Sequence, residues 1–442
     1  MRKNEIDAIL RAFTKDQLSP QAGDREFVSK VYASVGNALG KANCLQIGSF
    51  ARYTAIRPLH DLDVLYVAGS YENEDPDPSE CLAELLKQLR DRFRNPTDLE
   101  FELHLQTHSV TICFKRGLAE VFSVDVVPAY TDRKNEFGLD MYVVPEIAMM
   151  GRVRKAEVRK QVVSGQHRMR WIRSDPRGYV QLASQLNAKN EDFRRSAKFL
   201  KGWRAACKRR DSSFALKSFH LEQAVGAVFE RNPNSSIFDA VFEVMCQMPD
   251  LVRYPRFPDR ADHAVHIDEY VSRLSHSDRR KIDKCRDHFL VQLEELKSAN
   301  DISSALSGDA YERVSDKETF LFDQRIPMLS ETEFKVIGAV LEKKGGFRAF
   351  VLNAIGHIRV TREIKFQVGR DAPTGCMFKW KVRNDKDSKE PRGEITDHRT
   401  LSDPEKTAYI GTHWVECFAV RDGICVGRGK QYVRLDNLTP EM

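Results

Sequence analysis

The sequence contains no run that approaches the roughly 20 consecutive apolar residues of a membrane-spanning helix. Its first residues, MRKNEIDAILRAF, include acidic side chains and no apolar core, so we do not expect a secretory leader. The nine cysteines are scattered singly and show neither a CxxC pair nor the spacing of a metal finger. These absences predict a cytoplasmic protein whose cysteines are small core residues in a reducing compartment.

Internal repeats and low-complexity segments are also missing from the sequence. With 41% apolar and 30% charged residues, the composition is that of a folded globular protein. A chain of 442 residues should form two or three domains with a substantial core. The net charge of +6 suits polyanionic substrates, but it is too mild to identify one.

The chain is organised around residues 44–67, which read CLQIGSFARYTAIRPLHDLDVLYV. Gly48 can let the backbone approach a ligand closely, and Ser49 can offer its N–H and its hydroxyl to a phosphate oxygen. Asp61 and Asp63 open a run rich in β-formers, and residues two apart on a strand project from the same face. Adjacent carboxylates repel each other unless a cation neutralises them, and Mg²⁺ prefers such oxygen ligands.

A third carboxylate, Asp125, stands among valines in the strand-like run EVFSVDVVP at residues 120–128. Taken alone, a Gly-Ser pair is usually a turn, and an Asp-x-Asp pair is usually a solvated strand end. An isolated charge in an apolar strand has few ordinary explanations, because an unpaired buried charge is costly. The combination predicts a metal-dependent site that handles nucleotides.

The order of Gly-Ser, Asp-x-Asp and a later single Asp resembles the polymerase-β-type nucleotidyltransferases. Within them, GSFARYTAIRPLHDLDVLYV resembles the cGAS/DncV-like enzymes (CD-NTases), which make oligonucleotide second messengers in bacterial antiphage defence. The resemblance covers roughly the first 300 residues. It implies two Mg²⁺ ions, replaceable by Mn²⁺, held by Asp61, Asp63 and Asp125. It also implies nucleoside triphosphates, ATP among them, as substrates, and an effector protein that reads the product.

Two further residues gain a role from this resemblance. In the family, the lysine of a K-x-W helix and the serine of an L-K-S-[YF]-x-L-E segment contact the donor triphosphate. Lys201 and Ser218 occupy these positions here. As isolated residues, both would be ordinary surface groups.

The fold class that we predict is α+β. A polymerase-β-type core over residues 1–145 is followed by a helical nucleotide-binding lobe over 146–300. In the core we expect a mixed sheet flanked by helices, with the three aspartates on its concave face. The expected helices cover 5–20, a segment that begins at Asp24 as N-cap, and 82–93; the expected strands cover 61–67, 99–105, 108–114 and 119–127. A basic run at 152–173 is either solvated helix surface or a contact for nucleotide phosphates or bound nucleic acid.

Residues 301–330 lose periodicity and are predicted to be a linker, followed by a strand-rich domain at 331–442. Its pattern, WKVRN…RG…EKTAYIGTHWVECFAVRDGICV, resembles the adenylyl/guanylyl cyclase and CD-NTase-associated C-terminal sensor module, a nucleotide sensor with β-sandwich character. The candidate residues for a nucleotide or nucleic-acid ligand are Trp380, Arg383, Asn384, Arg392, Tyr409 and His413; ordinary core and loop positions are the alternative. His413 and Cys417 could share a strand face, but two further metal ligands are missing.

The expected activity is therefore template-independent transfer of nucleotides into an oligonucleotide, cyclic if the last step closes on the first residue. Linear products from ribo- or deoxynucleotides, or extension of an RNA 3′ end, remain alternatives. A catalytically idle module that senses nucleotides and recruits a partner is an alternative of another class, although the intact aspartates argue against it.

Overall fold

The structure is a computed structural model that describes residues 2–71, 76–147, 169–296, 298, 301–342, 348–352, 358–385, 387–397 and 403–436. It divides into two compact units. The N-terminal unit comprises residues 9–244 and 249–279, and the C-terminal unit comprises 1–8, 245–248 and 280–442. Within the described ranges, every helix is too short or too polar to cross a membrane.

One mixed sheet forms the frame of the N-terminal unit. Its strands are β1 (Cys44–Ile47), β2 (Asp61–Ser70), β3 (Glu100–Leu105), β4 (Val110–Arg116), β5 (Ala119–Lys134), β6 (Asp140–Ile147) and β7 (Met169–Ser174). The order is β1-β2-β5-β4-β3, while β6 pairs with β5 and with β7. β2 and β5 are parallel, and the other pairs are antiparallel. The expected mixed sheet is confirmed, with β5 extending seven residues beyond its predicted end at 127.

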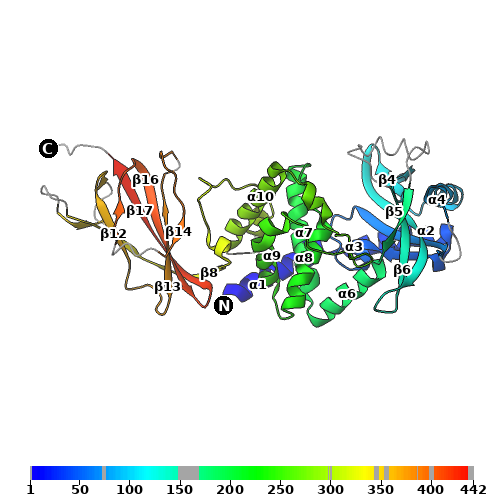
Figure 1. Cartoon of the computed structure of the whole chain (residues 1–442), viewed down its shortest axis with the longest axis horizontal. Helices are drawn as coiled ribbons and strands as arrows, with labels where there is room; N and C mark the ends of the chain where they lie inside the picture. The colour runs from blue at the N-terminus through cyan, green and yellow to red at the C-terminus, as the bar shows by residue number, and fades with distance from the viewer. Residues whose placement is uncertain are drawn as a thin grey trace. The chain divides into compact units, whose positions relative to one another are not determined.

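Two helices, α2 (Ala22–Leu39) and α4 (Pro78–Arg92), cover one face of this sheet (Figure 1). Leu62 and Val64 of β2 are almost fully buried in the core beneath them. The same core contains Val28, Val31, Val35, Leu82, Leu85, Leu89, Val110, Ile112, Val124 and Val126. Because side chains alternate along a strand, the odd-numbered residues of β2 face away from these helices.

The N-terminus of α2 differs from the prediction. Its N-cap is Gln21, and Asp24 lies three residues into the helix. The Asp24 carboxylate accepts a hydrogen bond from the Gln21 N–H at 2.7 Å, which forms a capping box. Asp24 therefore stabilises the first turn from inside the helix. In α4 the N-cap is Asp77, which accepts bonds from the backbone N–H groups of Ser79 and Glu80.

The remaining helical segments are α1 (Arg2–Phe13), the π-helix η1 (Thr14–Leu18), η2 (Lys41–Asn43), α3 (Gly48–Ala51), α6 (Pro176–Lys189), α7 (Asp192–Arg210), α8 (Ser218–Arg231), α9 (Ile237–Leu251), η3 (Glu269–Arg273), α10 (His276–Glu294), α11 (Ile302–Ala305) and η5 (Leu321–Gln324). The expected helix at 5–20 is thus α1 followed by a wider π turn. The expected helical lobe is present from α6 onward.

Of the two interpretations of the basic run 152–173, the one that places it on a helical surface is wrong for its last residues. Arg170 and Arg173 belong to strand β7 and pair with Glu146 of β6 and Asp132 of β5. Long-range pairing with β6 overrides the local pattern here. Residues 152–168 of the run lie outside the described residues.

The C-terminal unit contains two packed sheets (Figure 1). Their strands are β8 (Met328–Phe334), β9 (Val336–Val340), β10 (Phe350–Val351), β11 (Ile358–Arg359), β12 (Glu363–Val368), β13 (Met377–Arg383), β14 (Ile395–Thr396), β15 (Glu405–Lys406), β16 (Gly411–Arg421) and β17 (Ile424–Asp436). One sheet has the order β10-β9-β12-β15, and the other has β11-β17-β16-β13-β14 with β8 beside β17. Phe366 of the first sheet and Val415 of the second share one apolar core, so the predicted β-sandwich character is confirmed.

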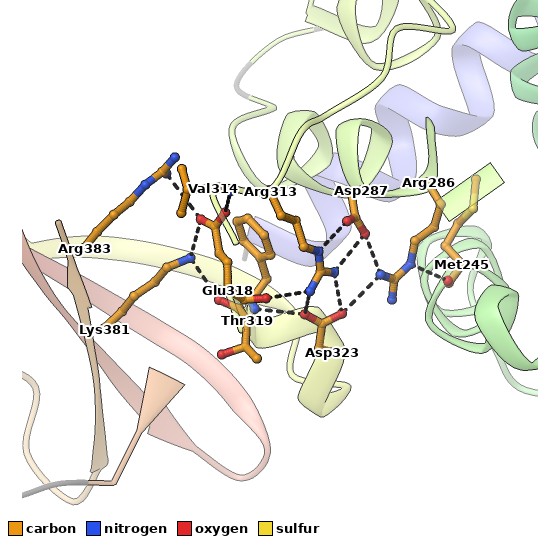
Figure 2. Close-up of polar contacts among 11 residues, drawn as sticks. Met245, Arg286, Asp287, Arg313, Val314, Glu318, Thr319, Asp323, Lys381 and Arg383 are labelled. Carbon is orange, nitrogen blue, oxygen red and sulfur yellow. Dashed lines mark hydrogen bonds and ion pairs between the residues drawn. The ribbon is translucent and has the colours of Figure 1, made fainter. Parts of the chain in front are cut away.

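Residues 301–330, expected to be a linker, carry two short helices and several buried side chains. Glu318 is fully buried and pairs with Lys381 at 3.3 Å and with Arg383 at 3.5 Å (Figure 2). Arg313 donates to Asp287 at 2.7 Å and to Asp323 at 2.9 Å. These pairs join the segment both to α10 and to β13 within the C-terminal unit.

Candidate active site

The three predicted aspartates lie on adjacent strands of the N-terminal sheet. Asp63 of β2 stands directly opposite Asp125 of β5 in the parallel ladder. Asp61, two residues earlier on β2, projects from the same face as Asp63, away from α2 and α4. The Thr111 hydroxyl of β4 donates a hydrogen bond to Asp125 and orients that carboxylate. Strand register therefore brings the three carboxylates to one face of the sheet. The Asp125 side chain is half-buried there.

Gly48 opens the short helix α3, and residues 48–54, called the Gly-Ser turn below, pack against this acidic face. Its φ is +70°, and a Cβ at this position would lie 1.7 Å from Asp63 Oδ2. Any other residue would therefore displace the carboxylate as well as strain the backbone. This close approach fixes the Gly-Ser turn beside the aspartates. Ser49 follows directly, and its carbonyl accepts a hydrogen bond from the Thr54 N–H at 2.9 Å.

The electrostatics of the acidic face favour a positively charged ligand. Removal from water, followed by repulsion from Asp61 and Asp125, raises the pKa of Asp63 to about 6. The pKa of Asp61, which is the more exposed group, is also raised, by its partial removal from water and by Asp125. Like-charged carboxylates held together in this way are stabilised when a cation binds between them.

The donor set fits a hard divalent cation, since carboxylate oxygens in this register are the ligands that Mg²⁺ and Mn²⁺ prefer. In the described part of the chain, however, no three acidic, histidine or cysteine side chains are already arranged around one metal position. The strand register brings Asp61, Asp63 and Asp125 to the same face of the sheet.

A buried polar cluster, formed by Arg52, Thr54, Lys201 and Glu222, supports the Gly-Ser turn. Lys201 on α7 donates to the Thr54 carbonyl at 3.1 Å, to the Thr54 hydroxyl at 2.9 Å and to Glu222 on α8. Glu222 also accepts from Arg52 Nε at 2.5 Å and from the Thr54 hydroxyl at 2.7 Å. All four residues are at most 8% exposed. The cluster ties the turn to both helices.

The charges of this cluster stabilise one another. Burial alone would favour a protonated Glu222, but Lys201 and Arg52 hold the pKa of Glu222 down to about 2. Burial lowers the pKa of Lys201, and Glu222 opposes that shift. The Arg52 guanidinium also lies 4.7 Å from the centre of the Phe219 ring.

The structure places the two residues that were expected to bind the donor on the neighbouring helices α7 and α8. Lys201 lies beside the turn, where its ammonium group contacts Thr54 and Glu222. Ser218 is the first residue of α8 and is half-buried. These contacts do not test whether Lys201 or Ser218 binds a phosphate group, so both roles stay predictions.

Sequence reasoning missed Arg52, Thr54 and Glu222. Arg52 and Thr54 stand within the stretch GSFARYT, and Glu222 ends the segment LKSFHLE. All three therefore lie in motifs that the sequence analysis had already selected. An available signal was the charge pattern itself, because a glutamate among apolar helix residues must find a buried cation.

The six candidate ligand residues of the C-terminal unit do not form one site. Asn384, Arg392, Tyr409 and His413 line a cavity of about 240 Å³. Arg383 lies instead at another cavity, of about 230 Å³. For Trp380 the alternative of an ordinary core position holds, because strand alternation turns its side chain into the sandwich core, where it is 8% exposed.

Several polar groups at the 240 Å³ cavity already have partners. His413 Nδ1 accepts from the Asp385 N–H at 3.1 Å, and its Nε2 lies 2.8 Å from the Tyr409 carbonyl. Both ring nitrogens are therefore engaged, and Cys417, the possible second metal ligand, is buried in the apolar core. Arg392 pairs with Glu405 at 3.1 Å. These contacts hold the loops around the cavity.

Comparison with known protein families supports the prediction of a sensor module in the C-terminal region. Residues 313–436 match the family described as the Adenylyl/Guanylyl and SMODS C-terminal sensor domain. The module expected from the sequence is thus confirmed, and it begins earlier than the predicted boundary at 331. No curated protein matches the chain.

Solved structures similar to the chain include proteins of the kind that the sequence resemblance named. CdnC from Escherichia coli MS115-1, solved with ATP, is 15% identical, with 69% of this chain and 98% of CdnC covered and a TM-score of 0.49. The Rhodothermus marinus CdnE c-UMP-AMP synthase is 13% identical, with 64% and 96% covered and a TM-score of 0.42. The Vibrio cholerae di-nucleotide cyclase DncV is 15% identical, with 70% and 86% covered and a TM-score of 0.41. Because these values are low, the function proposed below rests on the residues of the site.

Proposed function

We propose that this chain is a metal-dependent nucleotidyltransferase that joins nucleoside triphosphates into an oligonucleotide second messenger, closed into a ring by the last transfer. One observation carries the proposal: Asp63 and Asp125 stand opposite each other on parallel strands, with Asp61 on the same face and Gly48 pressed against Asp63. This places an acidic face beside a turn whose backbone can approach a phosphate group.

The three aspartates would hold Mg²⁺ or Mn²⁺. When bound, such ions lower the pKa of an attacking ribose hydroxyl and neutralise charge on the phosphates. The aspartates themselves fix where the acceptor hydroxyl and the α-phosphate meet. Thr111 keeps Asp125 in place, and the lack of a Cβ at Gly48 leaves room for the Asp63 carboxylate.

The Gly-Ser turn is the proposed binding element for the donor triphosphate. Ser49 would donate its N–H and hydroxyl to a phosphate oxygen. Lys201, through Thr54 and Glu222, acts as a positioning residue for the turn, and a direct contact with the triphosphate would require its ammonium to leave Glu222. Ser218, at the start of α8, is proposed as a second contact.

The match of residues 313–436 to a sensor family supports a regulatory role for the C-terminal unit. A nucleotide in the 240 Å³ cavity would change the activity of the N-terminal unit. A role in antiphage defence, with an effector that reads the product, follows from the sequence resemblance and is part of the proposal.

Product analysis tests this function. The purified chain is incubated with labelled ribo- or deoxynucleoside triphosphates and Mg²⁺ or Mn²⁺, and the products are treated with phosphatase. A metal-dependent product that keeps its label after phosphatase treatment, with release of pyrophosphate, is expected for a cyclic oligonucleotide. Phosphatase-sensitive products would favour a linear oligonucleotide. No product with any nucleotide pair would support the idle module instead.

A further inference from the structure

A cavity of about 350 Å³ in the N-terminal unit has a strongly basic lining. It lies between the end of α1, the π-helix η1, and helices α6 and α7. Five lining residues are cations, namely Arg11, Lys15, Arg194, Arg195 and Lys198. None of the three catalytic aspartates borders it, so this cavity, the basic cavity, is a separate feature of the molecule.

Only part of this positive charge is neutralised. Asp192 accepts from Arg11 at 2.6 Å and from Arg195 at 3.0 Å, and Glu191 accepts from Arg195 at 2.5 Å. Among the described residues, no carboxylate forms an ion pair with Lys15, Arg194 or Lys198. Three of the five cationic side chains around the cavity therefore lack a carboxylate partner, and one of them, Lys15, is exposed to solvent.

A hydroxyl group in the wall also lacks a partner. Thr14 is 1% exposed, and its Oγ forms no hydrogen bond with any described residue. It opens the π-helix η1, a rare conformation that is frequent at functional sites. Two other lining residues contact each other, since Lys198 Nζ donates to Ser19 Oγ at 3.0 Å. A buried hydroxyl and a set of unpaired cations are complementary to the oxygen atoms of an anion.

The lowered pKa of Lys198 also agrees with a site for an anion. Partial burial, and then the charges of Arg194 and Lys201, lower the pKa of Lys198 to about 8. An anion bound beside it would favour the charged form and relieve this repulsion.

We propose that the basic cavity binds a compact phosphate-bearing anion, such as the phosphate chain of a nucleotide or free pyrophosphate. Lys198, Arg194 and Lys15 would pair with phosphate oxygens, and rotation of the Thr14 side chain would let its hydroxyl donate to one of them. The volume of the cavity suits a small ligand. Because Lys198 is half-buried, a phosphate group that enters the cavity can reach it more easily than an extended nucleic-acid strand can. The inference does not depend on the proposed nucleotide transfer.

The cavity is connected to the Gly-Ser turn by direct contacts. Arg194 Nε donates to the Arg52 carbonyl at 3.0 Å, and its guanidinium lies 4.7 Å from the centre of the Tyr53 ring. The Leu18 carbonyl at the end of η1 accepts from the Arg57 N–H at 2.8 Å. An anion that engages Arg194 would therefore act on the turn that flanks the acidic face.

Calorimetry with tripolyphosphate tests the site. The full chain is used with Asp61→Asn and Asp63→Asn substitutions and with EDTA, so that metal-dependent binding at the acidic face is removed. One equivalent should bind, with a rise in the thermal midpoint. Lys198→Met should weaken this binding at least about 10-fold, because charge-assisted hydrogen bonds are lost. Lys208→Met, at the exposed end of the same helix, should leave it unchanged.

Thr14→Val separates ligand binding from folding. Valine removes the unpartnered hydroxyl at similar volume, so the midpoint of the unliganded chain should stay the same or rise, while affinity falls several-fold. Binding that survives both Lys198→Met and Thr14→Val overturns the proposal. An equal response to chloride at matched ionic strength, or binding of a 5′-phosphorylated RNA without binding of tripolyphosphate, also overturns it.

Discussion

At the scale of single residues, Glu222 is the centre of the buried cluster that supports the Gly-Ser turn. Lys201→Met removes one of its two cations and leaves a charge that Arg52 compensates only in part. We expect the free energy of unfolding to fall by about 3–5 kcal/mol, the range for breaking a buried ion pair. Urea unfolding measures this, and Glu222→Gln combined with Lys201→Met should recover part of the loss. Lys208→Met is the exposed control; a loss for Lys201→Met as small as that of this control would contradict the cluster's role.

His220 gives the N-terminal unit a defined pH dependence. The residue is 2% exposed and contacts the Tyr270 hydroxyl at 2.9 Å. Burial lowers its pKa to about 4, against the pull of Asp268. The unfolded chain therefore takes up a proton below its ordinary value of about 6.5, while the folded chain does not do so until about pH 4. Stability is complete above this window and is lost as the pH falls through it.

We expect His220 to lower the free energy of unfolding by about 2 kcal/mol between pH 7 and pH 5. Urea unfolding at both pH values measures the change. His220→Gln removes the titrating group, so the loss of stability between the two pH values should be smaller in that variant. An identical pH dependence in the two proteins would show that His220 is not the responsible residue.

At the scale of elements, the turn between β1 and β2 should tolerate only glycine at position 48. Gly48→Ala should reduce product formation about 100-fold, because its Cβ would displace the Asp63 carboxylate. The left-handed backbone adds about 1–2 kcal/mol of strain. Gly23→Ala in α2 is a matched control, since nothing lies within 4 Å of its Cβ. Unfolding and turnover assays on both variants check this; full turnover in Gly48→Ala would contradict it.

The elements that local patterns specify were predictable, and those that depend on distant partners were not. Asp61, Asp63 and Asp125 were found because a carboxylate in an apolar strand run is conspicuous, and the strand period then fixed their common face. The partners of Glu222 lie 21 residues away at Lys201 and 170 residues away at Arg52. The apolar surroundings of Glu222 indicate that it needs a buried cation, but neither local sequence identifies Lys201 or Arg52 as that cation.

Strand β7 and Trp380 are two further cases in which the local sequence did not predict the structure. β7 is specified by its pairing with β6, while its neighbours in sequence are strongly basic and suggested a solvated helix. Trp380 was chosen as a ligand residue because aromatic side chains often stack on bases. In β13, however, the alternation places Trp380 in the core and Lys381 against Glu318, so both faces of the strand are buried.

At the scale of the whole molecule, residues 301–330 should be needed for the stability of the sensor module. A fragment that starts at 331 loses Glu318 and leaves Lys381, which is 3% exposed, without its carboxylate. A fragment that starts at 275 keeps Glu318, Arg313 and Asp287 together (Figure 2). The longer fragment should therefore unfold cooperatively at a clearly higher temperature, as measured by near-ultraviolet circular dichroism. Equal midpoints would restore the linker interpretation.

The central claim is that the acidic face performs nucleotidyl transfer. The most direct test is product formation by the double variant Asp61→Asn and Asp63→Asn, with Asp91→Asn on the exposed side of α4 as control. Removing two ligand charges should lower turnover at least about 1,000-fold, equivalent to several kcal/mol of transition-state stabilisation. The thermal midpoint should stay the same or rise, because repulsion between the carboxylates is relieved. Turnover like that of the unsubstituted chain in a folded double variant would contradict the account.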